Sequence, residues 1–294
     1  MSRYHSYVLV VLAAIMSFGC SRDEDPVDKG DYIGFSGSAH NSSEVTKATG
    51  ATLVNTNEKL QGSSFGIFGY RSSDNINFNS RVFESDAAEE VSFTGSEWAY
   101  EPKQKWIKSN WYRFRAFWPF NARISPGSDA NLMVIDHSAI TDLYDLQIAY
   151  TERYPLSQST DRVNMVFEHA LTAVRFVVKF PDGSDANDVI KEFYLKGIKP
   201  TGTLVCGLDG TNMSPDDFRW VSNTFDSTSE FLKWTGSKTF SEAGTTIYDN
   251  DGVVFMIPQE VSSSKGDTSL NFYTSRGGGA LHTAVLPNDI WAAG

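Results

Sequence analysis

The stretch that decides the fold is Trp111-Tyr-Arg-Phe-Arg-Ala-Phe-Trp118. Within it, Arg113 and Arg115 alternate with Phe114 and Ala116. Alternation of polar and apolar residues is typical of a β-strand, because successive side chains of a strand point to opposite faces. The aromatic residues strengthen this prediction, since they pack well on a pleated, half-buried surface.

Segments of the same kind recur along most of the chain. They are short, rich in β-branched and aromatic residues, and bounded by Gly, Pro, Asn or Asp. The other strand candidates are residues 65–70, 174–180, 192–198, 203–208, 253–257, 270–274 and 281–286. A short helix is suggested only at residues 216–221. With 20 Phe, 12 Tyr and 7 Trp, the sequence predicts an all-β protein of sandwich type.

A change of domain is expected at residues 156–161, where Leu-Ser-Gln-Ser-Thr-Asp is polar and turn-prone. A new apolar stretch begins at Val163. This pattern predicts two tandem β-sandwich domains, at residues 32–160 and 161–294, and each has an ordinary domain size.

Residues 1–19 have the pattern of an export signal. Arg3 precedes an unbroken apolar run at residues 8–16, which is too short to span a membrane and suits the core of a signal peptide. The following Ser17-Phe-Gly-Cys20 resembles a bacterial lipobox, which makes Cys20 the candidate for lipidation. The alternative is an ordinary secretory signal with a chance cysteine.

Residues 20–31 are expected to form a flexible tether. The segment Ser21-Arg-Asp-Glu-Asp-Pro26 is polar and acidic, and such a segment cannot bury itself. An acidic cluster directly after a lipidated cysteine also resembles the surface-export signal of Bacteroidota lipoproteins. A solvated run of charge is the alternative.

Composition and charge exclude several classes of protein. The net charge is −11, with 36 acidic and 25 basic residues, so nucleic acid is a poor partner. Two cysteines cannot form a disulfide framework or a cysteine-rich zinc site, and Cys206 is expected to be a buried thiol. The sequence contains no zinc-protease motif, nucleophile elbow or phosphate-binding loop. We therefore expect no enzyme activity, no catalytic residue, no metal and no cofactor.

Aromatic residues crowd the segment 98–120, and two interpretations remain open. Trp98, Trp106 and Trp111 are candidate contacts for a glycan, because flat aromatic rings can stack on sugars. Crowded aromatic residues in adjacent strands also pack against one another, and this core role is the more common one.

Several short motifs follow one another after the tether. They are Tyr32-Ile-Gly-Phe35, Val45-Thr-Lys-Ala48, Ser64-Phe-Gly-Ile-Phe-Gly-Tyr70, Trp98-Ala-Tyr-Glu-Pro102, Arg115-Ala-Phe-Trp-Pro-Phe120, Asp145-Leu-Gln-Ile-Ala149 and Val166-Phe-Glu-His-Ala-Leu-Thr-Ala-Val-Arg-Phe176. In this order and spacing, and together with Cys20, they resemble the fimbrillin (Mfa-like) family of Bacteroidales.

The resemblance implies a fold and a role. Fimbrillins are lipoproteins with two transthyretin-like β-sandwich domains, and they serve as subunits or tips of type V pili or as related surface adhesins. The implied partners are other pilus subunits and host or bacterial surface ligands. The implied location is the outer membrane and cell surface, through lipid on Cys20. The rival interpretation is a surface glycan-binding lipoprotein that uses the Trp and Tyr residues at 98–118.

The resemblance also implies a route of assembly. In the family, a protease cuts after a basic residue that follows the first strand, and a strand donated by another subunit fills the groove that is left. The exchanged strand would contain Tyr32, Ile33 and Phe35, and the cut would fall between Lys47 and Ala48. The alternative is that Lys47 is an ordinary exposed lysine in an uncut, lipid-anchored member.

One departure from the family concerns the last residues. Family members continue past a tryptophan into a final strand, which is the donor in polymerising members. Here the sequence closes on Ile290-Trp-Ala-Ala-Gly294. We therefore expect a missing final strand, through truncation or as a property of this member, which puts self-polymerisation in doubt.

Overall fold

The structure is a computed structural model of the 294-residue chain. It describes residues 32–40, 56–84, 87–120, 124–126, 132–135, 145–153, 162–179, 188–199, 202–206, 218–222, 228–241, 243–248, 253–261, 268–275, 279, 281–286 and 289–291. Strands make up nearly all of the regular structure in these residues, and the only helix among them is the short α1 (Asn57–Leu60). The prediction of an all-β protein is confirmed.

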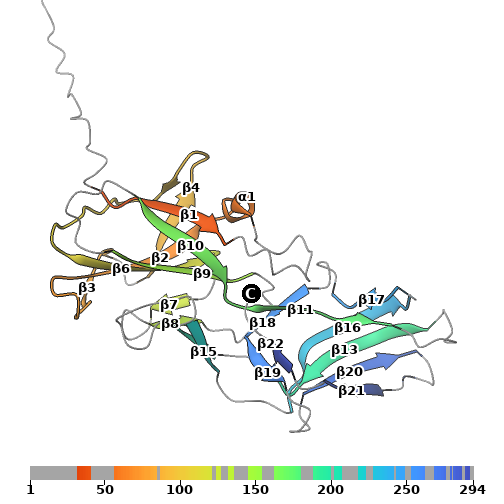
Figure 1. Ribbon diagram of the computed structural model, residues 1–294. Coiled ribbons are helices and arrows are strands. Elements are labelled where there is room, and N and C mark those ends of the chain that lie inside the picture. Colours follow the sequence, from red (N-terminus) through yellow and green to blue (C-terminus); the bar gives the residue numbers. More distant parts are fainter. Residues whose placement is uncertain are drawn as a thin grey trace, which may run out of the picture.

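The first sheet contains eight strands and closes on itself. Its strands are β1 (Phe35–Ala39), β2 (Phe65–Ser72), β3 (Ser80–Arg81), β4 (Glu89–Phe93), β5 (Trp98–Ala99), β6 (Trp111–Trp118), β9 (Gln147–Arg153) and β10 (Val163–His169). Their order is β3-β2-β4-β5-β1-β10-β9-β6, and β2 also pairs with β6. All of these strands except β3 therefore form a ring, which encloses one apolar core (Figure 1).

Both faces of β6 are buried. Tyr112 and Phe114 belong to the first core cluster, inside the ring, and Phe117 belongs to a second apolar cluster on the other side. Arg113 and Arg115 share the side of Phe117, and they are only 5% and 1% exposed. The alternation in this segment therefore marks a strand whose polar face is also covered, because other parts of the chain pack against the outside of the ring.

Most of the remaining strands form small sheets beyond the ring. A four-stranded sheet has the order β16-β13-β20-β21. Its strands are β13 (Val189–Lys196), β16 (Phe231–Thr239), β20 (Ser269–Thr274) and β21 (Leu281–Val285). Three further pairs are β11 (Thr172–Arg175) with β18 (Val253–Met256), β12 (Val177–Val178) with β17 (Thr245–Thr246), and β19 (Gln259–Val261) with β22 (Asp289–Trp291). A third apolar cluster packs against β13 through Phe193 and Leu195.

A further sheet mixes early and late parts of the chain. It joins β7 (Ile124–Pro126) and β8 (Leu132–Ile135) to β14 (Gly202–Cys206) and β15 (Phe218–Ser222). The strand β15 corrects the short helix expected at residues 216–221, since pairing with β14 outweighs the local sequence preference.

Strand pairing crosses the boundary expected between residues 160 and 161. The strand β10 follows that boundary in sequence and yet belongs to the first sheet, while β7 and β8 precede it and pair with the later β14. A polar, turn-prone segment predicts a loop, and a loop can lie within a sheet as well as between domains. The division of the chain into two domains stays a prediction.

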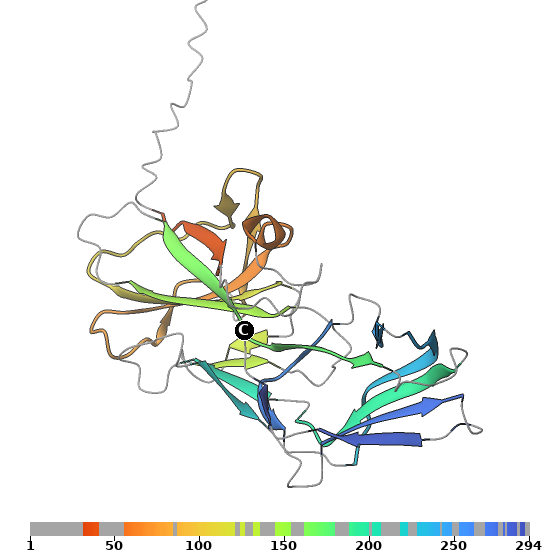
Figure 2. The ribbon, with the colours of Figure 1, turned by 45° about the vertical axis from the view of Figure 1, so that its right-hand side comes forward.

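The second apolar cluster connects the ring to the rest of the molecule. It contains Phe117 of β6 and Ile148 of β9 from the ring, together with Val253 and Phe255 of β18. In both ribbon views, β11 and β18 lie between the ring and the β16-β13-β20-β21 sheet (Figures 1 and 2). The strand β18 also contributes Val254 and Met256 to the third cluster, so it contacts apolar residues on both of its faces.

Candidate functional site

The first strand, β1, lies between two neighbours that run in opposite directions. It pairs in parallel with β10, where Phe35 lies opposite Val163, and antiparallel with β5, where Phe35 lies opposite Trp98. Just before the strand, the Val163 N–H donates to the Gly34 carbonyl oxygen at 2.7 Å. Because β1 has a partner on each side, its removal would leave two unpaired strand edges.

Inward side chains at the start of β1 and just before it fill part of the first core cluster. Ile33 and Phe35 are 1% and 0% exposed. The centroid of the Phe35 ring lies 5.3 Å from that of Phe114, 5.5 Å from that of Tyr100 and 6.4 Å from that of Phe83. These three rings form a pocket around Phe35, and such tilted and edge-on contacts add to the stabilisation from burial.

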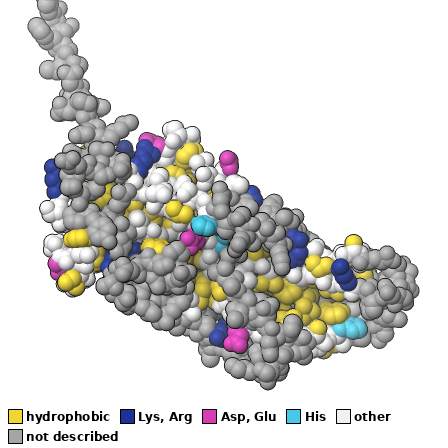
Figure 3. Space-filling view, viewed as in Figure 1, with side chains coloured by type: hydrophobic (Ala, Val, Ile, Leu, Met, Phe, Trp, Pro, Cys, Tyr) yellow, Lys and Arg dark blue, Asp and Glu magenta, His cyan; other side chains and the backbone are white. Residues whose placement is uncertain are grey.

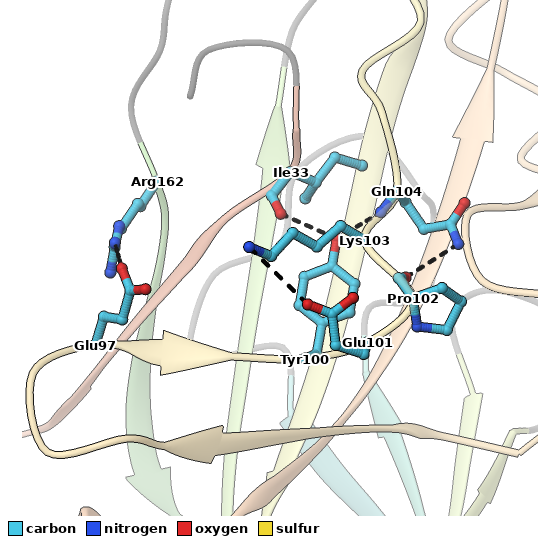
Figure 4. Close-up of polar contacts among 8 residues, drawn as sticks. All are labelled: Ile33, Glu97, Tyr100, Glu101, Pro102, Lys103, Gln104 and Arg162. Atoms are coloured by element: carbon cyan, nitrogen blue, oxygen red, sulfur yellow. Dashed lines mark hydrogen bonds and ion pairs between the residues drawn. The ribbon is translucent and has the colours of Figure 1, made fainter. Parts of the chain in front are cut away.

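Tyr100 holds the chain at the beginning of β1 (Figure 4). Its hydroxyl donates to the Ile33 carbonyl oxygen at 2.9 Å and accepts from the Gln104 N–H at 3.1 Å. The Ile33 N–H donates to the Gln104 carbonyl oxygen at 2.8 Å. Burial raises the pKa of Tyr100 to about 12, so at neutral pH the hydroxyl keeps the proton that it donates.

The helix α1 holds the other end of β1. Thr56 caps this helix by accepting a hydrogen bond from the Lys59 N–H at 3.3 Å. The side-chain oxygen of Asn57 accepts a hydrogen bond from the Ala39 N–H at 2.9 Å. Leu60 is buried in the first core cluster. The packing of Leu60 in the core that β1 helps to fill therefore also positions Asn57 in α1, which binds the N–H of Ala39 at the end of β1.

An ion pair crosses the outward side of β1. Glu97 and Arg162 directly precede Trp98 and Val163, which are the two neighbours of Phe35. The carboxylate and the guanidinium are in contact (Figure 4), and the two side chains are 45% and 44% exposed. The pair therefore joins the strands on both sides of β1 over its outer face, and we call it the clasp.

The structure places the sequence-predicted strand residues as follows. Ile33 and Phe35 lie in the core, whereas Tyr32 is half-buried and forms an antiparallel bridge with Lys105. The ammonium of Lys105 lies 5.2 Å from the centre of the Tyr32 ring. Outside the described residues lie Cys20, Lys47 and Ala48.

Sequence reasoning did not identify the residues that hold β1 in place, although one of them, Tyr100, lies in the quoted Trp98–Pro102 motif. These residues are Asn57, Glu97, Tyr100, Gln104 and Arg162. No motif marks them as a group, because they come from three separate segments, at residues 57, 97–104 and 162. Only the packing of β5, β10 and α1 around β1 brings them together.

The tryptophans considered as glycan contacts pack against the protein itself. Trp98 is 7% exposed, and its ring centroid lies 4.9 Å from that of Phe65. Trp106 is half-buried and meets Tyr112 edge-on at 4.7 Å, while Trp111 packs against the second apolar cluster. Core packing thus accounts for these rings, and Trp98 has little surface left for a sugar.

The rest of the described surface points to no other chemistry. Among the described residues, no group of three or more His, Cys, Asp and Glu side chains could hold a metal ion. Within the same residues, no helix has the length and hydropathy needed to cross a membrane. On the face drawn in Figure 3, the described charged side chains are scattered and of both signs.

Comparison with known proteins identifies the family. The sequence model of the family described as fimbrillin-like matches residues 26–294. The chain belongs to the fimbrillin-like family. No curated protein matches the sequence of this fimbrillin-like chain.

Several solved structures resemble the fimbrillin-like chain. A candidate cell adhesion protein from Bacteroides ovatus has a TM-score of 0.52 at 15% identity, over 90% of this chain and 88% of that one. For a candidate cell adhesion protein from Bacteroides uniformis the TM-score is 0.45 at 13% identity, with 90% and 89% covered. A fimbrial assembly protein from Parabacteroides distasonis gives 0.36 at 9% identity, with 86% of each chain covered. The first likeness supports the fold alone, and the lower scores support no conclusion.

Family membership confirms the resemblance found in the sequence and supports a fimbrial or adhesin role at the cell surface. A fimbrillin-like protein is a structural and adhesive protein and not an enzyme. The family also suggests assembly with other pilus subunits.

Proposed function

We propose that this fimbrillin-like chain is a cell-surface fimbrial subunit or adhesin that assembles by exchange of its first strand. A protease removes the segment that carries β1, and a strand from another subunit takes its place. The observation that carries the proposal is the position of β1. Phe35 and the nearby Ile33, which precedes the strand, fill the core, while the β1 backbone lies between β5 and β10.

Loss of β1 would leave a groove in which apolar rings are exposed and backbone polar groups are unpaired. The rings of Phe83, Tyr100 and Phe114 would lose their contacts with Phe35. The N–H and carbonyl groups of β5 and β10 that face β1 would lose their partners. An incoming strand satisfies both at once, because its side chains fill the pockets and its backbone pairs with both edges.

The proposed cut lies in the stretch of sequence that connects β1 to α1. Residues 41–55 form this connection and contain Lys47. Incubation of the precursor with a trypsin-like protease, followed by N-terminal sequencing, is expected to give a new N-terminus at Ala48. The Lys47→Gln variant should resist this cut, and the control variant Lys59→Gln in α1 should be cut like the unaltered chain. A first residue other than Ala48 would count against the proposal.

Assembly is tested with the cut protein. After the cut, the chain is mixed with an uncut fimbrial subunit that carries a free donor strand, and the products are separated by size. Stable oligomers that form only after the cut support the proposal. If the cut protein stays monomeric with such a partner, strand exchange is excluded as the route of assembly.

We also propose that lipid on Cys20 anchors the uncut chain to the outer membrane. The Cys20→Ala variant is then expected to lose incorporation of labelled fatty acid and to leave the membrane fraction of cells. Equal membrane recovery of the variant and the unaltered chain would contradict the anchor.

A further inference from the structure

Three contacts along β1 restrict the side chains that can occupy the groove. We propose that the groove accepts only a donor strand with the pattern glycine, aromatic residue, any residue, glycine, as in Gly34-Phe35-Ser36-Gly37. The inference rests on the proposed function, because it describes the partner of the same groove. It adds to the proposed function a statement of which donor strands can enter the groove and which side chains of this chain select them.

The aromatic position is set by the pocket around Phe35. Phe35 is 0% exposed, and its ring meets Phe114 nearly at a right angle, at 80° between the two planes. The hydrogen bonds of Tyr100 to Ile33 and Gln104 fix another wall of this pocket. A shorter side chain would leave a cavity between rings that cannot move together to close it.

The second glycine is set by Trp98. A Cβ added to Gly37 would lie 3.2 Å from both Cε2 and Nε1 of the Trp98 ring, which is closer than ordinary van der Waals contact. The ring cannot easily retreat, because Phe65 and Phe93 pack against it at 4.9 and 5.3 Å between centroids. Glycine is therefore required here for space, and larger side chains at this position are rejected.

The first glycine is set by the clasp. A Cβ added to Gly34 would lie 3.3 Å from Cγ of Arg162 on the outward side of the strand. A side chain there would require Arg162 to move by a few tenths of an ångström, which would disturb its contact with Glu97. Glycine at this position allows the ion pair to close over the strand that occupies the groove.

The other outward positions are not restricted in this way. Ser36 and Ser38 are half-exposed, and the hydroxyl of Ser36 donates to the side-chain oxygen of Asn164 at 3.2 Å on the surface. Within residues 1–294, a glycine followed by an aromatic residue and then by glycine two positions later occurs only at 34–37. The donor that we propose is therefore this same stretch of a second copy of the chain.

The test uses the full chain with the recognition sequence of a specific protease inserted after Lys47. After cutting, β1 stays bound without a covalent link, and fluorescent peptides with the sequence of residues 32–40 compete for its place. The unaltered peptide and the Ser38→Val peptide are expected to exchange in, whereas the Gly37→Val and Phe35→Ala peptides should bind at least tenfold more weakly. Ser38→Val is the matched control, because it adds the same side chain on the outward side.

The outcomes separate this inference from the proposed function. If no peptide exchanges, the proposed strand exchange fails; if all peptides exchange equally, exchange stands and the selection by Trp98 fails. A second measurement places Gly37→Val and Ser38→Val in the uncut chain and compares their thermal midpoints. A midpoint for Gly37→Val that is clearly below that of Ser38→Val supports the inference, and equal midpoints overturn it even if no peptide exchanges.

Discussion

Asp74 shapes the loop between β2 and β3 through its carboxylate. It accepts hydrogen bonds from the N–H groups of Ile76 and Asn77, both at 2.9 Å, from the Ser72 hydroxyl at 2.5 Å and from the side-chain amide of Asn77 at 2.8 Å. These bonds, the one from the Asn77 N–H above all, hold the pKa of Asp74 well below its ordinary value of 3.8. The ionised form is therefore the one that stabilises the folded loop.

This lowered pKa predicts a loss of stability in acid. The contribution of Asp74 is fully present above about pH 4, the pKa range of an unfolded aspartate, and is lost as the pH falls towards the folded pKa. Urea unfolding at pH 5 and pH 2.5 should show a smaller acid loss for Asp74→Asn than for the unaltered chain. Glu84→Gln, at an exposed carboxylate, serves as the control. Equal acid losses in Asp74→Asn and the unaltered chain would refute the role of this loop.

At the scale of single residues, the sequence predicts which side chains lie in strands, but it does not predict the contacts between segments that are far apart in the chain. Alternation and aromatic content predict that Phe114 lies in a strand, and the family resemblance predicts the same for Phe35. They do not predict that both rings share a pocket, because that contact joins segments far apart in the chain. The clasp is equally hidden, since Glu97 and Arg162 are ordinary charged residues until β1 is placed between them.

At the scale of elements, the clasp supports β1 weakly and in a salt-dependent manner. Exposed ion pairs contribute about 0.2–1 kcal/mol, because water and salt screen the charges. A double-mutant cycle with Glu97→Gln and Arg162→Gln is expected to give a coupling free energy in that range, measured by urea unfolding. The coupling should shrink in about 1 M salt, where the Debye length is about 3 Å.

A second exposed ion pair provides the control for the clasp. Lys233 contacts Glu192 at 3.2 Å, and also Glu230 at 2.9 Å, far in sequence from β1. In the cut chain, removing the Lys233–Glu192 pair should not change the rate at which a peptide of residues 32–40 replaces β1. Removing the clasp should increase this rate. Equal exchange rates for both pairs of variants would show that the clasp does not retain the strand.

Strands were predicted well wherever β-branched and aromatic residues gather between turn residues. The expected segments overlap β2, β6, β11, β13, β14, β18, β20 and β21. Alternation was not required, since all four residues of β18 are buried. The segment 216–221 was assigned wrongly to a helix, since the hydrogen bonds of β15 to β14 are non-local and leave no short-range signal. The parallel pairing of β1 with β10 is non-local in the same way.

At the scale of the whole molecule, the second apolar cluster makes the ring and the remaining sheets depend on one another. Phe255 of β18 is buried in this cluster together with Phe117 of β6. We expect Phe255→Ala to lower the free energy of unfolding by about 3–5 kcal/mol. We also expect tryptophan fluorescence and circular dichroism to report one common transition, because both parts lose contacts together.

The control for this prediction is Leu281→Ala on β21, where Leu281 is 48% exposed. An exposed site of this kind should change the free energy of unfolding by no more than about 0.5 kcal/mol. Two well-separated transitions would instead favour the independent domains expected from the polar segment near residue 160.

The parallel pairing of β1 with β10 has a mechanical consequence for a filament. A strand that lies between two neighbours and is pulled along its own axis loads its hydrogen bonds simultaneously, in shear. The same strand pulled from the side would yield one bond at a time, like a zip. A donated strand that fills the groove in the orientation of β1 would therefore resist tension along the filament better than it resists peeling from the side. A pilus built from such subunits would withstand the drag of a flowing liquid.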